Sequence, residues 1–353
     1  MKSFIYDDIR NYFEKNRVPK FRYKQLITAV FKNFIIDFDE LTTYPKQLRE
    51  ELKEKFSLTT MTLKEEHKSS QTVKFLLEMK DKQYVESVLM QHSDGRNTVC
   101  VSSQIFCAVG CTFCATGANK FSRSLTTQEI IEQVLFVARY LKKYDEKVTN
   151  VVFMGQGEPF LAYNQVIGAI EILNSEDYFG IGARHITVST SGIIPRIRDY
   201  AIFPLQTRLA ISLHAPNDRL RSELMPLNRI YPLKDLMKAC DDYVKQTNKR
   251  ISYEYVLIKG VNDSLDCADE LVDLLIGRLA HVNLLIYNPH EFSKFEMPDK
   301  KTVMSFYNRL KEDGIEVSIR KSMGDDISGA CGQLSSKEIK NNLVGFEKEY
   351  LNT

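Results

Sequence analysis

The chain has 353 residues, of which 43% are hydrophobic and 27% are charged, and its formal net charge is +2. This length and composition predict a globular protein with one main domain and an appendage, and they exclude an intrinsically disordered chain. The longest apolar runs are far shorter than a membrane span and two aspartates come early, so we expect no membrane helix and no signal peptide. With so small a net charge, any surface for nucleic acid must be a local basic patch.

The first 60 residues predict a helical domain with a basic corner. Apolar residues recur at helical spacing in 5–13 and again in 23–31, as expected for two amphipathic helices. The stretch between them, 15–24, holds five basic residues, no acidic residue and two aromatic residues. Such a patch could bind phosphates and stack bases, or it could be an ordinary solvated corner, which this stretch alone slightly favours.

Residues 61–95 predict a small β-hairpin that connects the helical domain to the rest of the chain. Apolar residues alternate in 73–77, and a second strand-like run covers 84–90 after a polar turn. Glu86 lies in this second run, where alternation alone does not distinguish an active-site carboxylate from a solvent-facing residue.

From residue 98 onward, strand-like and helical segments alternate. Repeated strand–helix units predict a parallel sheet covered by helices, with functional groups on the loops after the C-terminal ends of the strands. The expected strands are 99–103, 150–154, 185–189, 209–213, 252–258, 281–287 and 315–319. The chain then divides into a helical accessory domain (1–60), the connecting hairpin (61–95), an α/β core (96–340) and a C-terminal tail (341–353).

Three of the seven cysteines lie within eight residues, with the spacing C-x3-C-x2-C. They are Cys107, Cys111 and Cys114. A zinc site usually has four ligands, whereas an iron–sulfur cluster held by three thiolates leaves one iron open to a ligand that is not protein. The alternatives are a chance cluster, or zinc with Cys100 as the fourth ligand. An odd number of cysteines suits a reducing compartment, so we expect a cytoplasmic protein.

The cysteine spacing resembles that of the radical S-adenosylmethionine (SAM) enzymes. In that superfamily SAM chelates the open iron of a [4Fe–4S] cluster, and its reductive cleavage gives a 5'-deoxyadenosyl radical. The resemblance implies a partial (βα)6 barrel, one [4Fe–4S] cluster per chain and SAM as cofactor. The segment Gly155-Gln-Gly157-Glu158 follows an expected strand and resembles the element that holds the amino group of SAM in these enzymes.

Polar residues follow several later strands, at Ser189, Ser212, His214 and Asn288. Each alone would be interpreted as a strand-end cap. Together with the turn that carries Glu158, they place polar groups at four strand ends in sequence order, which suits contacts with the ribose, carboxylate and adenine groups of a nucleoside cofactor.

The remaining cysteines are of two kinds. Cys240 and Cys267 lie within helical patterns and are expected to be small buried residues. Cys100 begins the strand before the cysteine cluster, and its pattern also predicts a buried residue. Cys331 lies in a glycine-rich loop after the last expected strand, where a thiol is a candidate nucleophile.

Six segments match motifs of one enzyme family. They are Cys107–Gly117, Met154–Pro159, Ser189–Gly192, Ser212–Asp218, Gly260–Asp263 and Gly324–Leu334. Together they resemble the radical SAM 23S rRNA adenine methyltransferases (RlmN/Cfr), over nearly the whole chain including the helical N-terminal part. Gln156 stands where the family usually has Met, and we expect little effect because the position lies between two glycines. The segment 118–125 is a looser match.

The resemblance implies a role for each group. One SAM methylates Cys331 and a second yields the radical that activates this methyl group, so two SAM are consumed per turnover. Glu86 matches the family's proton acceptor, and Cys100 matches the thiol that releases the product by forming a disulfide with Cys331. The implied cluster ligands are Cys107, Cys111 and Cys114. The implied SAM contacts are Gly157, Glu158, Ser189, Ser212, Leu213, His214 and Asn288.

The expected activity is methylation of C2 of an adenosine in 23S rRNA, adenosine 2503 in the family, with tRNA left open as a further substrate. The implied partners are this RNA and a flavodoxin-type electron donor, and we expect a monomer without a membrane contact. One alternative is the C8-methylating Cfr branch, which confers resistance to ribosome-targeting antibiotics, although Gly157-Glu158-Pro159 and other site residues favour C2. Another alternative is a zinc-stabilised RNA-binding module without catalysis, which would leave Cys331 and the SAM motifs without a role.

Overall fold

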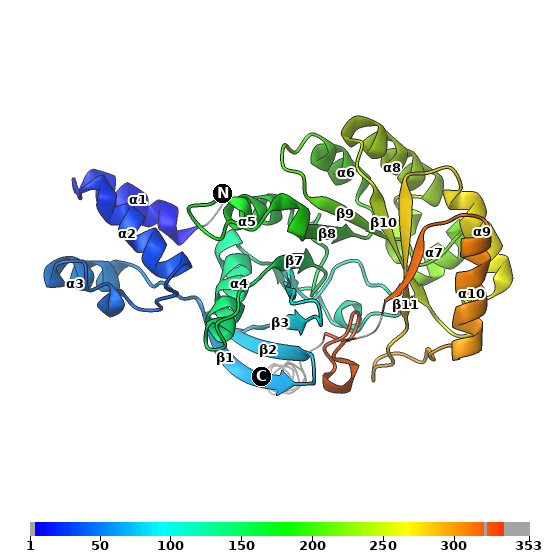
Figure 1. Cartoon of the computed structure of the whole chain (residues 1–353), viewed down its shortest axis with the longest axis horizontal. Helices are drawn as coiled ribbons and strands as arrows, with labels where there is room; N and C mark the ends of the chain where they lie inside the picture. Colours follow the sequence, from blue (N-terminus) through cyan, green and yellow to red (C-terminus); the bar gives the residue numbers. More distant parts are fainter. Residues whose placement is uncertain (1–3, 321–322, 335–353) are drawn as a thin grey trace, which may run out of the picture.

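The computed structural model describes residues 4–320 and 323–334, so the expected C-terminal tail at 341–353 lies outside the described residues. The N-terminal part forms the helical unit at the blue end of the chain in Figure 1. Its helices are α1 (Ile5–Lys15), α2 (Lys20–Phe31) and α3 (Lys46–Lys55). The two predicted helices are confirmed, because their apolar stripes bury Ile9 and Phe13 of α1 and Leu26 and Val30 of α2. Pro19 directly precedes α2, where its missing N–H and fixed φ suit a helix start.

The main sheet has ten strands in the described part of the chain, in the spatial order β1-β2-β3-β4-β7-β8-β9-β10-β11-β12. Pairing is antiparallel from β1 to β4 and parallel from β4 to β12. The bounds are β1 (Met61–Lys68), β2 (Thr72–Met79), β3 (Tyr84–Gln91), β4 (Asn97–Cys100), β7 (Asn150–Phe153), β8 (Ile186–Thr190), β9 (Arg208–Ser212), β10 (Ile251–Leu257), β11 (Ala280–Ile286) and β12 (Val317–Arg320). All seven strands predicted after residue 98 are confirmed, because short apolar runs between helical segments identify buried parallel strands.

Six strand–helix units follow one another along the chain, and β12 completes the sheet beside β11. The helices of these units are α4 (Thr127–Lys142), α5 (Tyr163–Asn174), α6 (Ile194–Ala201), α7 (Asp218–Leu224), α8 (Leu233–Thr247), α9 (Leu265–Leu275) and α10 (Lys300–Glu312). Figure 1 shows α8, α9 and α10 along the outer side of the sheet. The predicted α/β class and partial (βα)6 barrel are therefore confirmed.

The segment 61–95 contributes three strands to this sheet, one more than the predicted hairpin. Strands β2 and β3 form the expected hairpin, and β1 pairs with its free side. Almost every residue of β1 is exposed and five of its eight residues are charged or histidine, so it lacks the apolar alternation that identifies a strand. Such residues are typical of an exposed sheet edge. Because β3 also pairs with β4, Glu86 comes to lie on the strand next to Cys100.

Helix α4 connects the helical unit to the barrel. Glu132 of this helix is buried, and its carboxylate accepts the backbone N–H groups of Thr60 and Met61 at 2.6 and 3.1 Å. Arg139, almost two turns further on, donates to the backbone carbonyls of the loop after α2. The apolar cores of the two parts form one continuous cluster. No helix in the described residues is long and apolar enough to cross a membrane.

Candidate active site

The three clustered cysteines lie on a loop whose backbone is held by neighbouring segments. The Thr112 N–H donates to the last turn of α7 at 2.9 Å, and His290, after β11, bonds a loop carbonyl through Nε2 at 3.0 Å. The Ala115 N–H donates to the carbonyl of Gly332 at 2.7 Å. Since Gly332 follows Cys331, the fold brings the two sulfur sites predicted from sequence into one region.

Cys107, Cys111 and Cys114 are half-buried and lie within electrostatic reach of one another. Burial raises the pKa of Cys107 to about 12 and the pKa of Cys111 well above its ordinary value, and Glu158 acts in the same direction. A thiolate is therefore unfavourable here unless a cation offsets its charge, which fits iron ligation. In the described residues, no three His, Cys, Asp or Glu side chains are placed to hold a single metal ion. Thiolates of an iron–sulfur cluster each bind a different iron, so this three-cysteine set fits a [4Fe–4S] cluster.

The glycine-rich turn after β7 packs against the chain just before the cysteine loop. Gly157 has φ +100°, and a Cβ there would lie 2.5 Å from the Cβ of Gln104, so the close approach of two segments requires glycine. Glu158 is buried, and its carboxylate accepts hydrogen bonds of 2.7 Å from Thr190 Oγ1 and from the N–H and Oγ of Ser191. Burial raises the pKa of Glu158, while these hydrogen bonds oppose the shift. A ligand ammonium would therefore share Glu158 with these donors or replace one of them.

Three of the predicted SAM contacts come together at the ends of β8 and β9. The hydroxyl oxygens of Ser189 and Ser212 lie 3.3 Å apart. His214 is buried with its ring edge-to-face against Phe113 of the cysteine loop, and the ring centroids are 4.9 Å apart. Its Nδ1 accepts a backbone N–H of β10 at 3.1 Å. Burial, with a smaller effect of a nearby arginine, lowers the pKa of His214 to about 3, so the ring is neutral.

A buried arginine that the sequence reasoning missed organises these strand ends. Arg221 on α7 is fully buried and donates to the backbone carbonyls of Ser191, Ser212 and Leu213 at 2.7 to 3.2 Å. In the sequence, the only indication that Arg221 is buried is its position between Leu220 and Leu224, two apolar residues of the same helix. Leu213 is itself completely buried and Asn288 is half-buried after β11, and their contacts with SAM remain predictions.

Cys100 and Cys331 lie within electrostatic reach of each other. Cys100 is buried at the end of β4, where it packs with Val88 and Leu334, and Cys331 is exposed. Burial raises the pKa of Cys100, and the neighbouring Cys331 raises it further. The surrounding protein atoms desolvate the thiol and, followed by the charge of Glu254, raise the pKa of Cys331 to about 11, although solvent still reaches this residue. Both thiols are free.

Glu86 is buried on β3, with 1% of its surface exposed, which excludes the solvent-facing interpretation. Its Oε1 lies 3.1 Å from Nζ of Lys74, and burial raises the pKa of Glu86 while Lys74 opposes the shift. Its backbone N–H donates to Oε1 of Gln156 at 3.0 Å, and its carbonyl accepts the Ser102 hydroxyl at 2.6 Å. The β3–β4 ladder does not extend to Glu86, so these side chains replace strand pairing there. We expected little effect of glutamine at 156, whereas its side chain contacts the backbone of Glu86.

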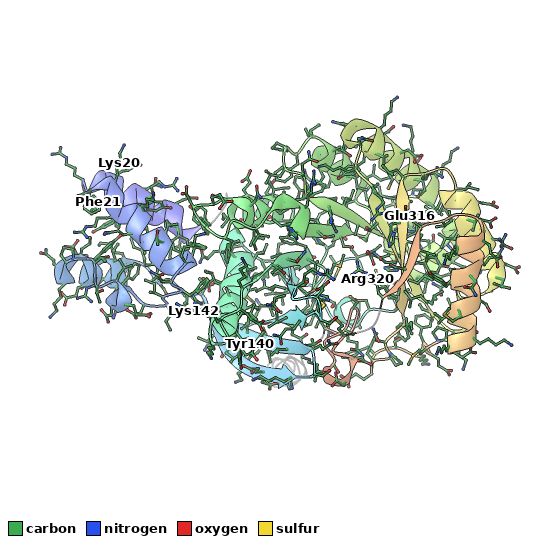
Figure 2. All side chains as sticks on the ribbon, in the orientation of Figure 1. Lys20, Phe21, Tyr140, Lys142, Glu316 and Arg320 are labelled. Carbon is green, nitrogen blue, oxygen red and sulfur yellow. The ribbon has the colours of Figure 1, made fainter. Side chains whose placement is uncertain are left out.

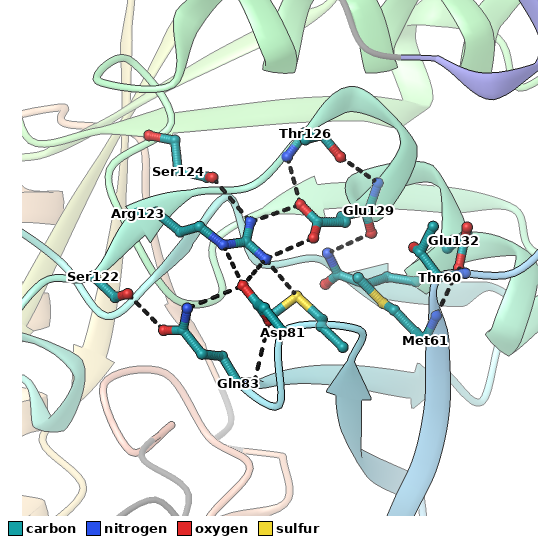
Figure 3. A network of polar contacts seen from close by, with 12 residues as sticks. Thr60, Met61, Asp81, Gln83, Ser122, Arg123, Ser124, Thr126, Glu129 and Glu132 are labelled. Carbon is teal, nitrogen blue, oxygen red and sulfur yellow. Dashed lines mark hydrogen bonds and ion pairs between the residues drawn. The ribbon is translucent and has the colours of Figure 1, made fainter. Parts of the chain in front are cut away.

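A polar network joins the loop after the cysteines to the β2–β3 hairpin (Figure 3). Arg123 donates two hydrogen bonds to the carboxylate of Glu129 on α4, at 2.9 and 2.7 Å. The same guanidinium pairs with Asp81 in the β2–β3 turn at 2.8 Å. The segment 118–125, the looser match to the family, therefore clamps the hairpin that carries Glu86 to helix α4.

Two family models match the chain, at the two parts that the fold distinguishes. The N-terminal domain of ribosomal RNA large subunit methyltransferases matches residues 2–58, and the radical SAM superfamily matches residues 101–275. A probable dual-specificity RNA methyltransferase RlmN of Caldicellulosiruptor saccharolyticus is 41% identical, and the match covers 96% of this chain and 97% of the relative. The protein of the same name from Bacillus subtilis is 43% identical, with 95% and 93% covered.

A solved structure agrees with these sequence matches. The crystal structure of a radical SAM methyltransferase from Sphaerobacter thermophilus is similar with a TM-score of 0.91 at 44% identity, over 93% of this chain and 96% of that chain. The radical SAM superfamily uses a [4Fe–4S] cluster and SAM, which agrees with the three-cysteine loop. The chain therefore belongs to the RlmN family of radical SAM RNA methyltransferases.

Proposed function

We propose that the protein methylates C2 of an adenosine in 23S rRNA, adenosine 2503 in the family, and that tRNA is a second substrate. The observation that carries the proposal is the grouping of a buried carboxylate, Glu86, with the thiols of Cys100 and Cys331 beside the three-cysteine loop. An sp2 ring carbon between two nitrogens is not nucleophilic, so direct methyl transfer from SAM fails there and a radical route is needed. The printed names of the relatives, dual-specificity RNA methyltransferases, support an RNA substrate.

In this proposal Cys107, Cys111 and Cys114 hold the [4Fe–4S] cluster, which together with SAM supplies a 5'-deoxyadenosyl radical. Residues at the ends of β7, β8, β9 and β11 bind SAM. They are Gly157, Glu158, Ser189, Ser212, Leu213, His214 and Asn288. A neutral imidazole beside paired hydroxyls suits the uncharged ribose and adenine groups of this ligand.

Cys331 carries the methyl group to the RNA. Its sulfur would accept a methyl group from one SAM and lose its proton, and that S-methyl group would then give up a hydrogen atom to the radical that the cluster and a second SAM would supply. The resulting carbon radical bonds to the adenine ring and joins the protein to the RNA. The adduct must also lose one electron, which the cluster could accept when bound, and Glu86 accepts the hydrogen of the attacked ring carbon as a proton, which restores the aromatic ring.

Cys100 releases the product. The Cys100 thiol loses its proton as its sulfur attacks the sulfur of Cys331, so that an S–S bond forms as the S–C bond breaks. The electron pair of the broken bond stays with the methylene carbon, which takes up a proton and becomes the methyl group of the product. A thiol reductant then returns both cysteines to the free state in which they stand here.

Residues 1–60 are proposed to be the RNA-contacting accessory domain, beside the hairpin 61–95 and the barrel core 96–340. Figure 2 shows Lys20 and Phe21 at the outer end of the helical unit, away from the barrel. Phe21 is 56% exposed, and the Arg22 guanidinium lies 4.9 Å from its ring centroid. An exposed aromatic ring beside cations suits stacking on a base next to phosphates. The target base must also leave its stack to reach the barrel.

The proposal includes a flavodoxin-type electron donor, a monomeric state and action in the cytoplasm, where ribosomal RNA is found. The decisive experiment compares 23S rRNA from cells with and without the gene, by nucleoside digestion and chromatography against 2-methyladenosine and 8-methyladenosine. A gene-dependent 2-methyladenosine peak is expected. A dominant 8-methyladenosine peak would place the protein in the Cfr branch, and an RNA without either nucleoside would contradict the proposed reaction.

A further inference from the structure

Lys74 is a buried cation in the middle of an apolar strand. It lies on β2, where its neighbours Val73 and Phe75 are buried, and its own side chain is 11% exposed. An ammonium group is costly to bury unless partners offset its charge and use its donors. Lys74 has two such partners, since its Nζ lies 3.1 Å from Oε1 of Glu86 and 3.3 Å from the backbone carbonyl of Ser328.

One of these partners is the proposed proton acceptor, Glu86, and the other, Ser328, lies in the loop that carries the proposed methyl carrier, Cys331. Strand register places Lys74 opposite Val88, and so on the same face of the sheet as Glu86 and Cys100. Ser328 belongs to the loop that carries Cys331. The same loop is seated directly on β2, because a Cβ at Gly324 would lie 2.7 Å from the Cγ2 of Thr72.

We infer that Lys74 is a positioning residue of the proton-transfer step, which keeps the Glu86 carboxylate charged and in place and ties the Cys331 loop to the same strand. This inference rests on the proposed function, in which Glu86 takes a proton from the RNA adduct. The second carboxylate oxygen, Oε2, is buried without a hydrogen-bond partner in the described structure, so it is the oxygen available for that proton. With Oε1 held by Lys74, one oxygen of the carboxylate stays paired and the other stays free to accept a proton.

Lys74 is also the dominant charge near Glu86. The other ionisable groups that act on Glu86 are His67, which favours its charged form, and Glu65, which opposes it, both on β1. Their side chains are 46% and 44% exposed, so water and salt screen them, whereas Lys74 is buried. The two thiols on the neighbouring strand and loop are uncharged, since burial raises the pKa of each.

The test replaces Lys74 by methionine, which keeps an apolar stem and removes the charge. Lys74→Arg, which keeps the charge, is the conservative variant, and Lys80→Met, at an exposed position of the same hairpin, is the control. Anaerobic single-turnover reactions are followed at several pH values, with peptide mass analysis of Cys331 and chromatography of the RNA product.

We expect Lys74→Met to methylate Cys331 like wild type and to accumulate the protein–RNA adduct. Product formation at neutral pH should fall by roughly 10- to 100-fold, which is less than the roughly 10²- to 10⁴-fold that a general base contributes, because Glu86 itself is still present. The loss should shrink as the pH is raised, because a carboxylate without its cation ionises at higher pH. Lys74→Arg should restore much of the rate, and Lys80→Met should match wild type.

A wild-type rate with an unshifted pH profile in Lys74→Met would overturn the inference. If Lys74→Met binds no iron and leaves Cys331 unmethylated, the same profile is measured on Lys74→Gln, which keeps a donor for the Ser328 carbonyl without a charge. An unshifted profile there would overturn the inference equally. Failure of the proposed function is separate, because Glu86→Gln would then form product as fast as wild type, whatever happens at Lys74.

Discussion

Replacement of Cys100 by alanine separates a packing role from a catalytic one. The side chain is 7% exposed, packs with Val88 and Leu334, and accepts the Met154 N–H at its sulfur. Loss of one sulfur atom from such a site leaves a small cavity and should lower the free energy of unfolding by about 1 kcal/mol. That is small beside the roughly 5–15 kcal/mol by which domains are stable, so the variant should fold and bind iron and SAM.

If Cys100 is the resolving thiol, Cys100→Ala cannot break the bond between Cys331 and the RNA. Labelled RNA should then remain attached to the protein on a denaturing gel. Adding Cys331→Ala to the same variant is the matched control, because it removes the point of attachment. Urea unfolding of wild type and Cys100→Ala gives the stability change. Normal turnover without any trapped RNA would refute the resolving role and leave Cys100 as a core residue.

Three further predictions concern the sulfur sites and the glycine-rich turn. Anaerobically purified protein should contain about four irons per chain, and alanine at all three clustered cysteines should abolish iron binding; a retained cluster in elemental analysis would contradict the ligand assignment. Cys331→Ala should be inactive while still binding iron and SAM, and peptide mapping of active wild type should find methylated Cys331. Gln156→Met removes an acceptor used by the Glu86 N–H but also a buried amide donor without a partner, so urea unfolding should show a change within about 1 kcal/mol.

The parts of the fold that follow from local pattern were predictable from the sequence. Most of the parallel strands are short apolar runs between helical segments, and burial on both faces produces such runs. Strand β12 is the exception, because none of its residues is fully buried. The spacing of Cys107, Cys111 and Cys114 predicted a cluster-binding loop without any knowledge of the fold, and the ligand role of these residues stays a prediction. Strand β1 escaped prediction because an exposed edge strand places charged residues where a buried strand has apolar ones.

The contacts that complete the site depend on segments far apart in the chain. The partner of the Glu86 N–H is Gln156, 70 positions away, and Lys74 reaches a carbonyl 254 positions away. Lys74 also interrupts an apolar run, so from the sequence it is equally compatible with a surface residue. The two partners of Lys74 can be identified only from the pairing register of β2 with β3 and from the packing of the Cys331 loop against β2.

The pH dependence of stability tests the buried histidine of the site. The pKa of His214 is lowered to about 3, first by burial and then by Arg221, whereas an unfolded histidine has a pKa of about 6.5. Between these values the unfolded chain binds a proton that the folded chain excludes. Stability from this residue is therefore complete above about pH 6.5 and falls as the pH decreases toward 3. At about pH 5 the loss should be about 2 kcal/mol, since each unit of pKa difference is worth about 1.4 kcal/mol.

Asparagine is the suitable replacement at this position. His214 has φ +58°, which asparagine tolerates, and an amide oxygen can accept the Val256 N–H that Nδ1 accepts now. Wild type and His214→Asn both contain Glu86 and Glu158, whose pKa values are raised by burial. These two carboxyl groups make the protein more stable as the pH falls, which is opposite to the effect of His214. Because they act equally in both proteins, the difference in pH dependence between the two proteins reports on His214 alone. Between about pH 7.5 and pH 5, the free energy of unfolding measured with urea should fall by about 2 kcal/mol less in His214→Asn than in wild type. Equal losses in the two forms would mean that His214 is not excluded from protonation, and its proposed place against an uncharged part of SAM would lose its physical basis.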